Sequence, residues 1–202
     1  MSRTITVNTD IDINIAQRGK LLLFDRRALR EGDILACRTT TGFGSKIRMI
    51  LGSYTNHNGI FVMKDGKWYI AEAVKPKSIL TPLSAYEKEI FDGTVVRVWR
   101  TANQSVTDEE RSAVAQYVLD HMLGLPYPIN VWRLWIFRLV NSLPWKIEGQ
   151  WCTRVVWEAW EKIVPGIFNR PDGKTKLNPT PRTFENRLVA GVVKDVTDVV
   201  LN

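Results

Sequence analysis

The sequence predicts an α+β domain, and three observations predict it. Strand-like patterns fill residues 31–101, whereas helical patterns follow over 107–164. Apolar residues make up 45% and charged residues 24% of the 202 residues, which is typical of a globular protein large enough for one buried core. Neither an internal repeat nor a low-complexity linker divides the chain. We therefore expect one domain over 1–202, with an N-terminal extension (1–30), a core (31–186) and a C-terminal segment (187–202).

The first half of the chain predicts a β-hairpin between two further strands. Residues 31–39, EGDILACRT, predict a turn and a short buried strand, and residues 93–101, GTVVRVWRT, predict another strand. Between them, residues 57–74 hold two β-rich runs joined by Asp65 and Gly66. An Asp-Gly pair in that place is the strongest short-range hairpin signal.

The second half predicts mainly helices. Residues 107–124 open with a capping box between Thr107 and Glu110 and end at Gly124. The other predicted helices are 45–52, with Ser45 as N-cap and Gly52 as its end, then 128–145 and 152–164, the last ending before Pro165. From residue 166 onward we expect a Pro-rich turn, followed by a run that fits a strand.

Residues 128–145 form the most apolar stretch of the chain. Arg133 and Arg138 interrupt it, and it is too short to span a bilayer comfortably. Leu134 and Phe137 lie off the main apolar stripe, so contact with a membrane is an alternative to packing in the core. The core is the preferred interpretation. The stripe consists of Trp132, Trp135, Ile136, Leu139, Val140 and Leu143.

Charge and composition narrow the classes of partner. The net charge of +7 suggests an anionic partner. No nucleic-acid-binding motif accompanies this charge, so we do not expect the partner to be a nucleic acid. Residues 1–20 lack the apolar h-region of a secretory signal, so we expect a protein made in the cytoplasm. There Cys37 and Cys152 would be thiols. The sequence has no CxxC or HExxH motif and predicts neither a metal site nor a cofactor.

The predicted hairpin brings one of the two histidines close to a carboxylate. With Asp65 and Gly66 as turn residues, Gly59 lies opposite Glu72 and His57 opposite Val74. His57 and Glu72 then share a face as diagonal neighbours, roughly 7–8 Å apart by backbone position. A carboxylate beside an imidazole fixes its tautomer and stabilises its protonated form.

Cys152 is the candidate nucleophile because it begins a predicted helix. The macrodipole and the free N–H groups of a helix N-terminus favour an anion, so the pKa of the thiol should fall. A neighbouring imidazolium would lower this pKa further, and the backbone N–H of Cys152 could stabilise an oxyanion.

Each of these residues also has a plain structural explanation. His57 could be a strand-end histidine bonded to a backbone carbonyl, Glu72 a solvated strand end, and Cys152 a small core residue. We expect Cys37 to be a core thiol, since it lies in the middle of a strand. We expect His121 to pack beside the apolar stripe of its helix.

Two stretches resemble the circularly permuted NlpC-like peptidases, a papain-like group. GDILACRTTTGFGSKIRMILGSYTNHNGIFVMKDGKWYIAEA matches that family's Gly-Asp-hydrophobic opening, short helix, histidine-Gly-Ile strand and Glu-Ala strand end. LGLPYPI and WCTRVVWEAW resemble its Gly-x-x-Tyr segment and its cysteine-bearing helix. The resemblance covers roughly residues 31–186. It implies a papain-like, circularly permuted fold, in which an antiparallel sheet packs against helices and the nucleophile begins a helix.

The resemblance also assigns roles. Cys152 is the expected nucleophile, His57 the base and Glu72 the residue that orients it, while Tyr54 and Trp151 are the expected substrate-binding residues. Asn58 stands where the family has an apolar residue, and Trp151-Cys152-Thr153 is an uncommon cysteine context. Both departures bear on which substrate is bound and leave the cysteine chemistry possible.

The implied function is hydrolysis of an amide bond, without cofactor or metal. The preferred substrate is a stem peptide of bacterial peptidoglycan, because its carboxylates suit a basic protein. Such an enzyme would reach the wall by a non-Sec route, in phage lysis or as an antibacterial toxin, with a delivery or immunity partner. Two alternatives stay open: a lipid acyltransferase or thioesterase that uses 128–145 as a membrane-facing lid, and an inactive binding module.

Overall fold

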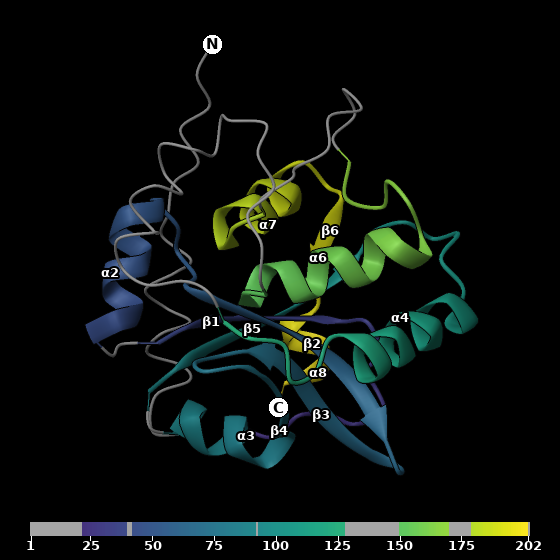
Figure 1. Ribbon diagram of the computed structural model, residues 1–202, viewed down its shortest axis with the longest axis horizontal. Coiled ribbons are helices and arrows are strands. Elements are labelled where there is room, and N and C mark those ends of the chain that lie inside the picture. Colours follow the sequence, from purple (N-terminus) through teal and green to yellow (C-terminus); the bar gives the residue numbers. More distant parts are fainter. Residues whose placement is uncertain (1–21, 40–41, 92, 128–149, 170–178, 202) are drawn as a thin grey trace.

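Six strands form one antiparallel sheet in the computed structural model, which describes residues 22–39, 42–91, 93–127, 150–169 and 179–201 (Figure 1). The spatial order is β4-β3-β2-β1-β5-β6, and each neighbouring pair runs antiparallel. The strands are β1 (Ile34–Arg38), β2 (His57–Lys64), β3 (Lys67–Ala73), β4 (Ser78–Pro82), β5 (Val95–Thr101) and β6 (Val193–Asp195).

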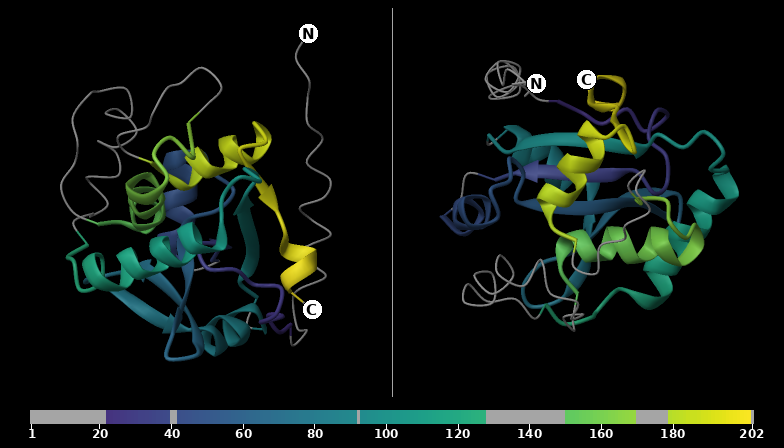
Figure 2. Two further views of the ribbon diagram at one scale, coloured as in Figure 1. Left: turned by 90° about the vertical axis from the view of Figure 1, so that its right-hand side faces the viewer. Right: turned by 90° about the horizontal axis from the view of Figure 1, so that it is seen from above.

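Helices pack on both faces of this sheet, which confirms the α+β class (Figures 1 and 2). Side chains of α4, α6 and α7 share a core with one face, and those of α3 and α8 share a core with the other. The helices are α2 (Gly42–Leu51), α3 (Leu83–Phe91), α4 (Asp108–His121), α6 (Cys152–Ile163), α7 (Pro181–Val189) and α8 (Thr197–Val200).

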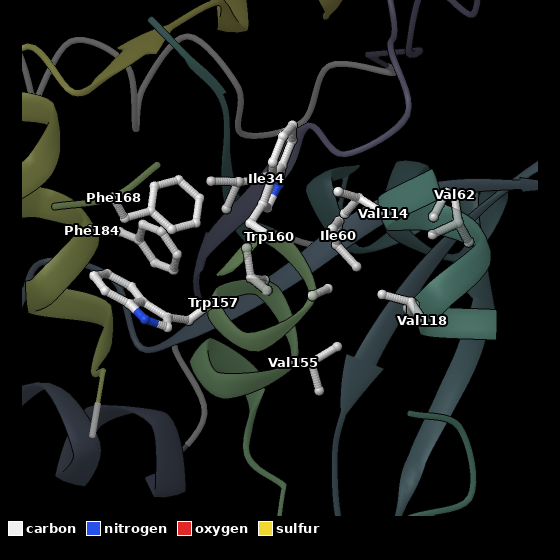
Figure 3. Close-up of a cluster of buried hydrophobic side chains, with 14 of the residues drawn as sticks. Ile34, Ile60, Val62, Val114, Val118, Val155, Trp157, Trp160, Phe168 and Phe184 are labelled. Carbon is white, nitrogen blue, oxygen red and sulfur yellow. The ribbon is translucent and has the colours of Figure 1, made fainter. Parts of the chain in front are cut away.

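The larger core lies between the sheet and helices α4, α6 and α7 (Figure 3). Trp157 and Trp160 of α6 both pack against Phe168, and Trp157 also packs against Phe184, with ring centroids 5.2–6.2 Å apart. The Trp160 indole also donates a 3.0 Å hydrogen bond to the Gly32 carbonyl. A Cβ on Gly32 would lie 2.5 Å from this ring, so the turn before β1 needs glycine there. These contacts fix α6 against the start of β1.

The predicted hairpin is confirmed, register included. Asp65 and Gly66 have φ values of 52° and 71°, as a type I′ turn requires, and Gly59 pairs with Glu72. The paired ladder ends there, so Val74 does not pair with His57; Cys37 of β1 lies opposite His57 instead. A Cβ on Gly59 would collide with the Ile70 side chain, so the space that glycine leaves is taken by Ile70.

Several other predictions can be compared with the structure. The capping box of α4 is confirmed, α6 ends before Pro165 as predicted although at Ile163 rather than 164, and Gly52 follows α2 with φ +60°. Ser45 was the wrong N-cap, because α2 already begins at Gly42. The C-terminal run holds only the three-residue β6, followed by α8. The predicted helix 128–145 lies outside the described residues.

Besides α8, three elements were not predicted. The Pro-rich stretch expected to be a turn begins α7, with Pro181 in the first turn, where its missing N–H costs nothing. β4 is a short edge strand that ends on a proline, and α3 follows it directly.

Among the described residues no helix is long and apolar enough to cross a membrane.

Candidate active site

Cys152 is the first residue of α6 and lies almost completely buried. Trp151, the N-cap, has an extended backbone and makes no side-chain capping hydrogen bond. The thiol therefore lies at a helix N-terminus, where peptide dipoles favour a negative charge. Its Sγ is 3.7 Å from the hydroxyl of Thr153, and that hydroxyl donates to Asn58 of β2.

His57 begins β2 and joins the thiol to a carboxylate. Its Nε2 contacts the Glu72 Oε2, as the diagonal position in the hairpin predicts. The imidazole and the Cys152 thiol also lie close enough for each to shift the pKa of the other. Because Nε2 faces Glu72, Nδ1 is the nitrogen left for the sulfur. The structure thus brings together Cys152, His57 and Glu72 from one helix and two strands.

The electrostatics of the three groups favour a thiolate–imidazolium pair. Burial alone would lower the pKa of His57, but its bonds to Cys152 and Glu72 raise it to about 10. Burial alone would raise the pKa of Cys152, but the imidazole and the Asn58 backbone N–H lower it below the ordinary thiol value. Between these two pKa values the proton lies on the imidazole and the sulfur is charged.

Glu72 is held by two donors besides His57. The Thr81 hydroxyl of β4 donates to its Oε1, and the Tyr86 hydroxyl of α3 donates to its Oε2 at 2.6 Å. Burial would raise the pKa of Glu72, but His57 and the two hydroxyls hold it below its usual value. The sequence analysis missed both hydroxyls because it predicted neither β4 nor α3.

The two predicted substrate-binding residues are engaged within the protein. The Tyr54 ring contacts the guanidinium groups of Arg38 and Arg97, whose Cζ atoms lie 4.7 and 5.5 Å from its centroid. Trp151 is buried, and its indole donates to the Pro179 carbonyl at 2.7 Å. Their role in binding stays a prediction.

Two further residues near the thiol were not assigned roles from the sequence. Asn58, noted only as a departure from the family pattern, is fully buried and donates to the Leu35 carbonyl at 3.2 Å. It thereby bridges β1 and the first turn of α6. Tyr127 lies in the Gly-x-x-Tyr segment, and burial together with the charge of Cys152 raises its pKa well above the usual value.

The other cysteine and the other histidine lie outside the candidate triad. Cys37 is completely buried in β1 and is a free thiol, as expected, and Cys152 is free too. His121 stacks on Tyr117 with centroids 4.9 Å apart, although its side chain is exposed rather than packed in the core. Within the described ranges, no group of three or more His, Cys, Asp or Glu side chains could hold a metal ion.

The family follows from a comparison with known proteins. The model of the permuted papain-like amidases, the YaeF/YiiX group or C92 family, matches residues 28–176. The chain belongs to this family. It is therefore a permuted papain-like enzyme of the cysteine peptidase and amidase class. The resemblance drawn from the sequence is confirmed at this level.

One solved structure shows the same fold. YiiX from Escherichia coli O157:H7, described as a metalloprotein, has a TM-score of 0.56 and 21% sequence identity to this chain. The match covers 83% of this chain and 96% of YiiX, and at this identity it supports the fold alone. No curated protein matches the chain.

Proposed function

We propose that this C92 amidase hydrolyses peptide bonds in bacterial cell-wall stem peptides, with Cys152, His57 and Glu72 as its catalytic triad. The observation that carries the proposal is the row of thiol, imidazole and carboxylate at the N-terminus of α6, in which His57 hydrogen bonds to Glu72 and lowers the pKa of Cys152. This row supplies a nucleophile, a proton carrier and an orienting group, which is what acyl transfer requires.

The reaction follows from the protonation states. The Cys152 thiolate attacks the amide carbonyl, and the carbonyl oxygen takes up negative charge that the N–H groups at the start of α6 can stabilise. The His57 imidazolium then gives its proton to the leaving amine, and a thioester to Cys152 remains. Water attacks this thioester while His57 takes the water proton, which releases the acid and restores the thiolate. Glu72 stays ionised and holds the imidazole in place.

Charge supports the choice of wall peptides among amides. The chain carries a net charge of +7, and stem peptides carry carboxylates, so attraction would raise the rate of encounter. An enzyme made in the cytoplasm that acts on the wall would also need a delivery partner, and an inhibitor would protect the cell that makes it.

Digestion of purified muropeptides tests the proposal. We expect new amines and carboxylic acids in equal amounts by mass spectrometry. Cys152→Ala should abolish them while the protein stays folded, because the change is small. Cys37→Ala is the matched control and should keep its turnover per folded molecule. Muropeptides left intact, with fatty acid released from a phospholipid panel instead, would contradict the proposed substrate.

A further inference from the structure

The Glu72 carboxylate makes more hydrogen bonds than the one with His57 that orienting the imidazole requires. Its side chain is 5% exposed, and donors reach it from three elements. His57 approaches from β2, Thr81 from β4 on the opposite flank, and Tyr86 from α3 across the same face of the sheet. Both carboxylate oxygens thus have a partner that lies outside the triad.

We propose that Tyr86 and Thr81 are positioning residues, which hold the Glu72 carboxylate charged and turned toward His57 and thereby set the reactivity of Cys152. The inference rests on the proposed catalytic roles of these three residues. It assigns a part in the reaction to β4 and α3, which supply no residue of the triad.

The geometry explains why two hydroxyls are useful here. The terminal torsion of a glutamate is broad, so one hydrogen bond to His57 leaves the carboxylate free to rotate about it. Thr81 fixes Oε1 and Tyr86 fixes Oε2, which defines the plane of the group. Donors to an ionised carboxylate also favour its charged form, against the cost of burying that charge.

Among the described residues, several charged or titratable groups lie close to this carboxylate or to the groups around it. They are His57 of β2, Cys37 of β1, Tyr86 and the exposed Glu89 of α3, and Cys152 of α6. Cys37 lies opposite His57, and burial together with the charge of Glu72 raises its pKa.

The consequence of losing a donor has a definite sign. Without Tyr86 or Thr81, Glu72 binds its proton more tightly, and a protonated Glu72 no longer stabilises the imidazolium. The thiolate then loses its counter-charge, so the pKa of Cys152 rises. The reaction rate of Cys152 increases with pH as the thiol loses its proton, and this rising part of the pH profile, the acid limb, moves to higher pH.

Alkylation by iodoacetamide measures this directly and needs no substrate. The rate at Cys152 is followed by peptide mass spectrometry as a function of pH, in wild type, Tyr86→Phe and Thr81→Val. In both variants we expect the acid limb to rise by roughly half to one pH unit, and kcat/KM on muropeptides to fall about 3–10-fold. Thr81→Ser keeps the donor and should restore the wild-type limb.

Two controls separate positioning from packing. Tyr69→Phe removes a hydroxyl from the opposite face of β3 and should leave the limb unmoved. In a Glu72→Gln background, Tyr86→Phe should cause no further shift, because no carboxylate remains to titrate. A limb that stays in place in folded Tyr86→Phe and Thr81→Val would overturn the inference, as would an equal shift in the Glu72→Gln background. Intact muropeptides together with the expected shifts would contradict the proposed substrate alone.

Discussion

The two thiols of the chain show how different surroundings shift the pKa of one kind of side chain in opposite directions. Cys37 is buried within the sheet, and burial together with the charge of Glu72 raises its pKa well above the thiol value. Cys152 is nearly as buried, yet its contacts with His57 and the Asn58 N–H lower its pKa. Burial is common to both, so the imidazole and the Asn58 N–H account for the difference.

At the third position of the proposed triad, Glu72→Gln should be milder than His57→Ala. An amide can still orient the imidazole, but it cannot offset its positive charge, so we expect a loss in kcat/KM of about 10–100-fold. His57→Ala removes the proton carrier itself and should cost more. Steady-state kinetics on one muropeptide compares the two, and wild-type turnover in Glu72→Gln would show that another group orients His57.

At the scale of elements, the hairpin is the part of the site that the sequence predicts best. Its register depends on a turn of two residues with positive φ, which is local information carried by Asp65 and Gly66. The contact of His57 with Glu72 follows from that register. The donors to Glu72 could not be placed in this way, because β4 and α3 pack there through contacts that depend on the whole sheet. The apolar spacing of Leu83, Tyr86 and Ile90 was the one signal for α3.

Gly59→Ala tests the hairpin as a support for the site. The added methyl would collide with Ile70 and lie 3.5 Å from the Cβ of Glu72. Overpacking of this kind typically costs about 1–3 kcal/mol, and the displaced Ile70 shares its face with Glu72, so turnover should fall as well. Denaturant unfolding and kinetics on the same preparation measure both effects.

Gly66→Ala is the matched control for this prediction. Its φ of 71° strains an alanine, but no atom lies within 4 Å of the added Cβ. This variant should lose stability and keep its turnover per folded molecule. Equal turnover in the two glycine variants would contradict the prediction that a methyl at Gly59 disturbs the position of Glu72.

At the scale of the whole molecule, a buried ion pair joins the turn before β1 to β5. Arg100 of β5 donates to both oxygens of Asp33 at 2.7 and 2.6 Å, and to the Ala28 carbonyl at 2.8 Å. Asp33 precedes β1 and is fully buried. Separately, Phe24 and Leu201 form an antiparallel bridge, so the N-terminal and C-terminal segments of the described chain meet. The Gly-Asp opening of the family pattern is thus structural here.

Asp33→Ala should destabilise the protein strongly, because it leaves the charge of Arg100 buried without its carboxylate. Breaking a buried pair from one side costs about 3–5 kcal/mol. Asp120→Ala is the control, since it removes only an exposed hydrogen bond from Gln116 and should cost below about 1 kcal/mol. Urea unfolding compares the two, and a similar small loss in both would contradict the proposed importance of the pair.

The central claim is that Cys152 is a thiolate because His57 lies beside it, and the pH dependence of Cys152 alkylation in wild type and His57→Ala tests it most directly. In the wild type the acid limb should lie below the ordinary thiol pKa of about 8.5, because the pKa of Cys152 is lowered. The imidazolium persists up to about pH 10, so the thiolate keeps its partner across the neutral range. In His57→Ala the limb should rise to the thiol value or above, since the imidazole, which most strongly opposes the effect of burial, is gone. A limb that is the same in both proteins would contradict the account.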